Sequence, residues 1–175
     1  MKLKNLFGPL HDAVVRLMGV TGLMLYANTQ AMATSFKVDL LNGIHAFGTT
    51  VARGGTTADS FKAALYFASA TINATTTAYS ATGEATGTGY TAGGIAVTNA
   101  TAPTSSGTTA FWTPSASLAF GTISITAFDT VLIYNSTQSN KAVSVHTFSA
   151  QTIVAGTFTL TMPTNAAGTA LVNIA

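Results

Sequence analysis

Much of the chain alternates apolar and polar residues, as β-strands with one buried face do. In GTFTLTMP, the apolar residues Phe158, Leu160 and Met162 alternate with threonines. Threonine suits the outer face because its branched Cβ favours an extended backbone. From Ser35 onward, similar short runs are separated by clusters of Gly, Asn, Pro and Ser. The predicted strands are SFKVDL, FKAALYFA, GIAVTN, SLAFGTISIT, TVLIYN, KAVSVHTF, GTFTLTMP and ALVNIA.

Turn signals between these runs set the fold class. Asn135–Asn140 separates two apolar runs and predicts a hairpin loop, and Ala155-Gly156 predicts a second turn. Many short strands with frequent turns are typical of an antiparallel β-sandwich or jelly roll. We therefore predict an all-β domain over residues 35–175, with little helix outside the N-terminal segment.

The residue pattern of positions 1–34 differs from that of the strand-rich remainder, and it predicts an N-terminal arm or leader. Leu10, Val14 and Leu17 recur at helical spacing, which indicates a short amphipathic helix. Three interpretations stay open: an arm, helical or extended, that docks on a neighbouring subunit, a signal peptide, or sequence upstream of a natural start at Met32. The apolar residues that an arm would offer are Phe7, Leu10, Val14 and Leu17.

Charge separates this chain from ordinary soluble domains. Charged residues make up 7% of it, against roughly 25% in an average domain. The net charge of +2 comes from residues 1–31, because residues 32–175 carry four basic and four acidic side chains. A nearly uncharged surface lacks the repulsion that opposes association, so the composition favours assembly. It offers no basic stripe for nucleic acid and no apolar run long enough for a membrane-spanning helix.

One glycine-rich run has the letters of a dinucleotide-binding fingerprint. Gly87–Ala92 reads GTGYTA, but the residues before it are irregular and GGIAVTN after it resembles a strand rather than a helix. No acidic residue lies about 20 positions further on, where the ribose contact belongs. We predict a loop between two strands and no nucleotide cofactor.

Other catalytic or metal-binding patterns are also absent from the sequence. The chain has no cysteine, and His11, His45 and His146 lack the spacing of paired ligands. The four carboxylates of residues 32–175, at positions 39, 59, 84 and 129, form no acid–base pair in the sequence. Alternation with Val143 and Val145 predicts that His146 faces outward or caps a sheet edge. We predict neither an enzyme nor a metal site.

Two aromatic residues are candidate interface residues. Trp112, in FWTP, is either a core anchor or an interface anchor, and the sequence favours the core. Tyr90 lies in the long loop 77–94, which together with loop 49–60 could supply contacts to other proteins.

Several blocks of the sequence resemble a group of small virion structural proteins of tailed bacteriophages. The resemblance covers roughly residues 35–175, and residues 1–31 depart from it. It implies a structural role and brings no catalytic residues. The blocks are FKAALYFASATINATTTAYSATGEATGTGYTAGG, FWTPSASLAFGT, LIYNSTQSNKAVSVHTF and GTFTLTMP.

The first hypothesis from this resemblance is a decoration or cement protein on the capsid surface. Its partners would be the major capsid protein and further copies of itself, as trimers or dimers. Alternatives are a tail, adaptor or fibre component of the virion, and a secreted β-domain that binds carbohydrate. A secreted domain would need a cleaved leader and aromatic platforms for sugars, and the chain has one tryptophan.

Overall fold

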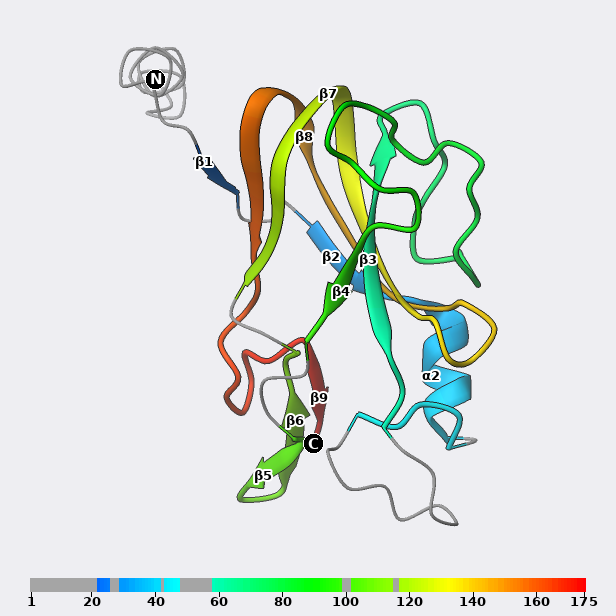
Figure 1. Ribbon diagram of the computed structural model, residues 1–175. Coiled ribbons are helices and arrows are strands. Elements are labelled where there is room, and N and C mark those ends of the chain that lie inside the picture. Colours follow the sequence, from blue (N-terminus) through cyan, green and yellow to red (C-terminus); the bar gives the residue numbers. More distant parts are fainter. Residues whose placement is uncertain (1–21, 26–28, 42, 48–57, 99–101, 115–116) are drawn as a thin grey trace, which may run out of the picture.

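The computed structural model describes residues 22–25, 29–41, 43–47, 58–98, 102–114 and 117–175. The described chain is mostly β-structure in two sheets, and it is all-β as predicted (Figure 1). The larger sheet has the order β1-β8-β7-β3-β4, with β2 also pairing with β8, and the smaller has the order β5-β6-β9. The elements are β1 (Gly22–Leu25), β2 (Thr29–Met32), α2 (Thr34–Leu41), β3 (Phe61–Phe67), β4 (Ile95–Val97), β5 (Thr104–Ser106), β6 (Thr109–Trp112), β7 (Ser117–Asn135), β8 (Lys141–Thr161) and β9 (Val172–Ile174).

A long antiparallel hairpin of β7 and β8 forms the centre of the larger sheet. Its loop follows Asn135, as predicted, and the Asn135 side chain shapes it. Asn135 Oδ1 accepts hydrogen bonds from the backbone N–H groups of Thr137 and Gln138, both at 3.1 Å. Ser139 and Asn140 complete the loop with positive φ angles of 52° and 59°.

The sequence predicted four strands where the structure has two. SLAFGTISIT and TVLIYN form the single strand β7, and KAVSVHTF and GTFTLTMP form β8. The prediction of a turn at Ala155-Gly156 is therefore wrong. Ala127 and Ala155 have φ angles of 54° and 48°, and the register shifts nearby are β-bulges that bend the strands without ending their pairing.

The bent hairpin surrounds an aromatic core. Phe158 meets Phe128 with ring centroids 5.0 Å apart and Phe148 at 5.2 Å, so side chains from both arms of the hairpin pack together. The predicted alternation in GTFTLTMP is confirmed, since Phe158, Leu160 and Met162 are buried and the intervening threonines are half-buried. The core is thus built as the sandwich prediction required.

SFKVDL is helical, which contradicts its predicted strand. Within the described residues α2 is the only helix, and it packs against the sheet through Phe36, which is fully buried. The Phe36 ring lies 4.7 Å from the His45 ring and 5.8 Å from Phe47. A run this short does not separate helix from strand by its period, and tertiary packing decides the outcome.

Candidate interaction surface

The glycine-rich run lies flat against β7, which explains its glycines. A Cβ placed on Gly87 would come within 2.0 Å of the Ser124 carbonyl oxygen, and one on Gly89 would meet the Thr122 oxygen at the same distance. Gly89 also has a φ of +80°. The backbone N–H of Ser124 donates to the Thr88 oxygen at 2.8 Å. The glycines permit close backbone contact, and β4 follows the run, as predicted, rather than a helix.

A buried carboxylate holds this loop in place. Glu84 is 6% exposed. Its Oε1 accepts hydrogen bonds from the Tyr90 hydroxyl at 2.8 Å and the Gly93 N–H at 2.7 Å, and its Oε2 accepts one from the Tyr79 hydroxyl at 2.6 Å. The Tyr134 hydroxyl donates to the Gly93 oxygen at 2.7 Å. A buried charge with three donors is well compensated, so Glu84 organises the loop.

The tyrosines around Glu84 act as fixed donors. Burial raises the pKa of Tyr66 to about 12, and the nearby Glu84 carboxylate adds to the increase. Burial and Glu84 likewise raise the pKa values of Tyr79, Tyr90 and Tyr134. These phenols therefore stay protonated at neutral pH. Their chemistry is that of a structural hydrogen-bond network around one carboxylate.

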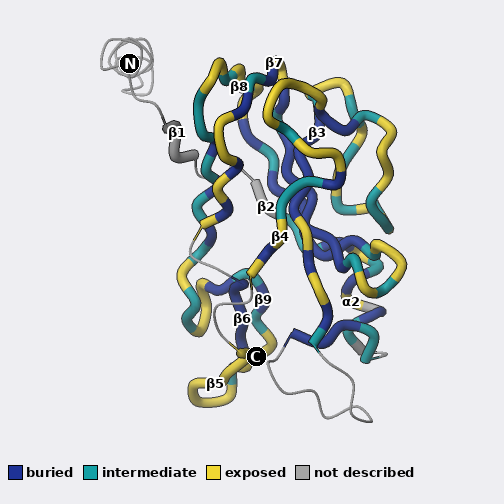
Figure 2. The backbone as a smooth tube through the Cα atoms, in the orientation of Figure 1, coloured by how far each residue is buried: buried dark blue, intermediate teal, exposed yellow. Residues whose placement is uncertain are grey.

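Next to this network lies an exposed surface that we call the crest, defined as residues 86–92, 121–127 and 149–156. A backbone hydrogen bond from the Ser124 N–H to the Thr88 oxygen joins the first two segments, and the Ala155 N–H donates to Ser124 Oγ at 2.9 Å. In Figure 2 the bend of β7 and β8 carries much of the exposed surface at the top of the molecule. The exposed crest residues are Thr86, Gly87, Thr88, Gly89, Thr91, Ala92, Gly121, Thr122, Thr126, Ala127, Ser149, Ala150, Thr152, Val154 and Ala155.

The crest contains no Lys, Arg, Asp, Glu or His. Its exposed side chains are mainly threonine and small residues, around one large apolar side chain. Val154 is 79% exposed, the highest value among the large exposed hydrophobic residues of the described chain. The crest therefore offers hydroxyl groups, accessible backbone and one apolar anchor, with no charge to desolvate.

Most acidic side chains of the described chain are buried. Asp39, Asp59 and Glu84 are 8%, 7% and 6% exposed, whereas Asp129 is half-buried. Lys37 and Lys62 are exposed. The few carboxylates thus serve internal contacts, and charged side chains are sparse on the described surface.

The other two buried carboxylates, Asp39 on α2 and Asp59, contact residues at the hairpin loop, which lies beside α2 in Figure 1. Asp59 Oδ2 accepts from the Ala46 N–H and from Asn135 Nδ2, both at 2.8 Å. Asp39 pairs with Lys141 Nζ, which lies 3.0 Å from each carboxylate oxygen. Throughout the described ranges, no three His, Asp or Glu side chains gather in a way that would hold a metal ion. These contacts tie α2 and residues 58–60 to the hairpin.

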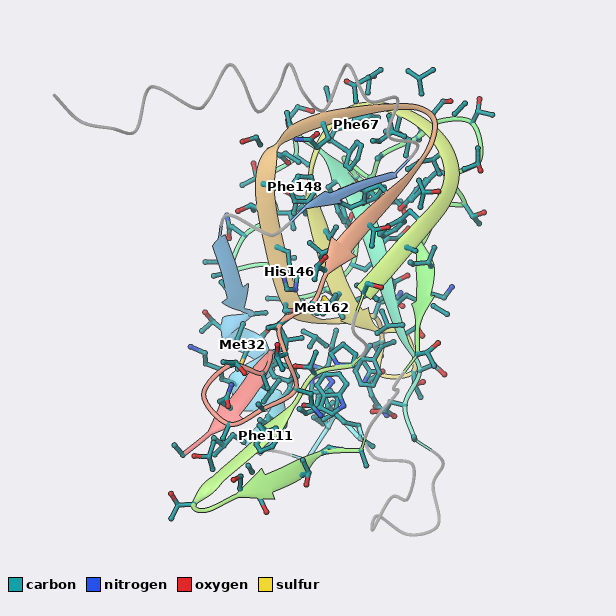
Figure 3. The ribbon with its side chains drawn as sticks, turned by 90° about the vertical axis from the view of Figure 1, so that its left-hand side faces the viewer. Met32, Phe67, Phe111, His146, Phe148 and Met162 are labelled. Carbon is teal, nitrogen blue, oxygen red and sulfur yellow. The ribbon has the colours of Figure 1, made fainter. Side chains whose placement is uncertain are left out.

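His146 does not face outward, and that prediction is wrong. It is 1% exposed on β8, with β7 on one side and β2 on the other (Figure 3). Its Nε2 lies 3.1 Å from Ser144 Oγ. Burial lowers the pKa of His146 to about 4, so the imidazole is neutral at pH 7.

The candidate interface residues from the sequence have different outcomes. Trp112 is 2% exposed and lies 4.3 Å from Phe47 between ring centroids, which confirms the core interpretation and removes it from the accessible surface. Tyr90 is half-buried at the base of the crest, bound to Glu84. Phe7, Leu10, Val14 and Leu17 lie outside the described residues, as do residues 49–57 of the predicted loop 49–60.

Sequence reasoning did not single out Val154 or Glu84. The signal for Val154 was Ile153-Val154, two adjacent β-branched residues that break a strict alternation. The signal for Glu84 was a lone acid in a tyrosine-containing loop. Each becomes informative only when the fold supplies its neighbours.

Comparisons of the chain with protein-family models, curated proteins and solved structures found no match. In the described residues, no helix combines the length and apolar character needed to cross a membrane.

Proposed function

We propose that this chain is a structural protein of a tailed-bacteriophage virion, a decoration protein that binds the head exterior and bridges major capsid subunits. The resemblance of residues 35–175 to virion proteins of tailed bacteriophages supports this class of particle. The observation that carries the proposal is the crest, because a broad uncharged surface suits contact with another protein. We assign the crest to the contact with the capsid.

The composition of the crest suits a protein interface for an energetic reason. A buried charge costs several kcal/mol unless it is well paired, and the centres of protein interfaces are depleted in charge. Threonine hydroxyls and backbone groups can form hydrogen bonds across an interface without that cost. Val154 would supply the apolar contact, as buried apolar side chains do at the centre of an interface.

The Glu84 network would hold the loop of the crest in one conformation before it binds. Ordering a loop on association costs roughly 0.5–1.5 kcal/mol for each immobilised side chain. Here the loop is fixed in advance through Tyr79, Tyr90 and Gly93, which all donate to one carboxylate. The crest would thus lose little conformational entropy when it meets a capsid subunit.

Reconstitution tests the proposal. Particles made without this protein are incubated with the purified full chain and imaged by cryo-microscopy, and we expect density on the head at positions where major capsid subunits meet. The variant Val154→Asp should bind at least about tenfold more weakly, since it places a charge in the interface. The matched control is Thr104→Asp, at an exposed residue of β5 in the smaller sheet.

Two results would overturn the proposal. Density confined to the tail would assign the chain to a tail, adaptor or fibre component. If the protein is absent from both reconstituted and wild-type particles, it is not a component of the virion. Equal binding of Val154→Asp and Thr104→Asp would remove the crest from the contact while leaving the decoration role.

A further inference from the structure

His146 is a basic group buried inside the larger sheet. It is 1% exposed, and its Nε2 lies 3.1 Å from the Oγ of Ser144, which is equally buried. A neutral hydroxyl can orient an imidazole, but it cannot balance the charge of an imidazolium that is kept from water. The charged form of His146 is therefore stable only where water reaches the ring.

Charged groups on the neighbouring elements do not change this. β1 and β2 have no charged side chain, and burial is what lowers the pKa of His146. The charged residues on the other elements that pack against β8, and on β8 itself, are Asp129 on β7, Lys37 and Asp39 on α2, and Lys141. None of these four contributes to the lowered pKa. Protonation within the closed sheet would thus leave His146 uncompensated.

Of the two strands beside His146, β2 is the one that can open. His146 is opposite Val131 on β7 and Gln30 on β2. β7 is a central strand of 19 residues, and Val131 is fully buried in it. β2 has four residues and pairs with β8 alone within the described chain. Local opening begins where few contacts are lost, so water would reach the imidazole from the β2 side.

The opening is limited at one end of β2. Ala33 is fully buried, and its N–H donates to the Val143 oxygen at 3.1 Å. Met32, just before it, is partly buried against the core. Residues 29–31 come before this anchor and lie opposite residues 145–147 of β8. The part of β2 that can separate is therefore the part that flanks His146.

We infer that protonation of His146 separates residues 29–31 of β2 from residues 145–147 of β8, while Met32, Ala33 and the rest of the sheet stay in place. β2 is then an acid-sensitive edge strand. Acid favours the open form because that form binds the proton more readily than the closed form does. The inference concerns the sheet of a single copy and does not depend on the proposed function.

Amide hydrogen exchange distinguishes this local opening from unfolding of the whole sheet. Along an antiparallel strand, successive N–H groups point to opposite neighbours. The hydrogen bond donated by Ala33 sets this alternation, so the amides of Val145 and Thr147 point to β2 and those of Ser144 and His146 point to β7. Separation of β2 would expose the first pair of amides and leave the second pair protected.

The test follows these four amides of the full chain by nuclear magnetic resonance at pH 7 and pH 5, with each exchange rate divided by the intrinsic rate at that pH. With a pKa of about 4 in the closed sheet and near 6.5 in the open one, the protection of Val145 and Thr147 should fall about twentyfold. Protection of Ser144 and His146 should fall by less than about twofold. In His146→Gln, the first pair should keep its protection.

Three results would overturn the inference. Equal loss of protection at all four amides would mean that the whole sheet opens. No loss at Val145 and Thr147 would mean that β2 stays closed, and an equal loss in His146→Gln would assign the opening to another group. His146→Phe provides a second variant that cannot titrate, should His146→Gln fail to fold. Density on the head, which tests the proposed function, is a separate readout from these amides.

Discussion

Buried carboxylates in this protein hold loops rather than face solvent. Glu84 joins Tyr79, Tyr90 and Gly93, and Asp59 joins Ala46, Asn135 and Gln138. An ionised acceptor forms stronger hydrogen bonds than a neutral one, and one carboxylate can serve several donors. A chain with few charges thus uses most of its described acids to fix the segments between strands.

Glu84→Gln tests this role at the residue scale. The amide keeps the shape of the side chain but replaces one acceptor oxygen with an N–H₂ donor, which opposes a tyrosine hydroxyl or the Gly93 N–H. We expect a loss of about 1–3 kcal/mol in the free energy of unfolding, measured by urea denaturation. Asp129→Asn is the matched control, because Asp129 is half-buried and accepts from Thr130 Oγ1 at 2.7 Å. An equal effect of the two substitutions would contradict the special role of Glu84.

His146 predicts sensitivity to acid. Its pKa is about 4 in the folded protein, whereas an unfolded histidine titrates near 6.5. The unfolded state therefore binds more protons between these values, and stability falls as the pH decreases from about 6.5 towards 4. The two pKa values correspond to a loss of about 3 kcal/mol.

His146→Gln should remove this component. The free energy of unfolding, measured by urea denaturation across that pH range, should fall less steeply in the variant than in the parent. All other titrating groups are shared, so the difference in slope belongs to His146. Equal slopes would show that His146 contributes no acid sensitivity.

The position of a single residue could be predicted where its size and its neighbours in the sequence indicate whether it is buried. Trp112 in the core follows from its size and its place beside Phe111 in FWTP. His146 was placed wrongly because alternation identifies two faces of a strand but not whether both are covered. Ser144 and His146 are on one face and Val143 and Val145 on the other, and all four are buried.

At the scale of elements, the sequence identified the strands better than their continuity. β3, β4 and β9 and the Asn135–Asn140 loop were predicted, whereas β7 and β8 were each divided in two. Alanine seldom adopts a positive φ, so the sequence gives little sign of bulges at Ala127 and Ala155. The glycine of Ala155-Gly156 and the change in alternation there predict a turn, although a bulge produces the same pattern.

The close contact between the glycine loop and β7 gives a prediction at this scale. Gly89→Ala places a methyl group against the Thr122 oxygen and imposes a φ of +80° on a residue with a Cβ. We expect a loss of about 1–3 kcal/mol in the free energy of unfolding and faster amide exchange in residues 86–92. Gly121→Ala is the control, because a Cβ there meets nothing within 4 Å. If both variants behave alike, the loop does not depend on this contact.

At the scale of the molecule, the crest and the ionic contacts of the described residues lie in different places. The crest forms at the bend of β7 and β8, whereas the Asp39–Lys141 pair and the Asp59 network lie near the hairpin loop and α2 (Figure 1). Composition alone indicated a surface poor in charge. It did not indicate where charge would be absent, because that depends on the bulges that bring residues 121–127 and 149–156 together and on the glycine loop that joins them.

This separation predicts how binding responds to salt. Association driven by opposite charges weakens steeply as the Debye length falls from about 14 Å at 0.05 M to about 4 Å at 0.5 M salt. The crest has no charged residue, so its contact with a capsid would have no such component. We expect the affinity of the full chain for particles made without it to change by less than about threefold over this range, as measured by co-sedimentation.

Thr122→Lys and Thr126→Lys would introduce charge into the crest and make binding depend on salt, whereas Thr104→Lys in β5 would not. Binding by the unmodified chain that fell tenfold or more over the same range, about 1.4 kcal/mol, would mean that a charged surface outside the crest makes the contact.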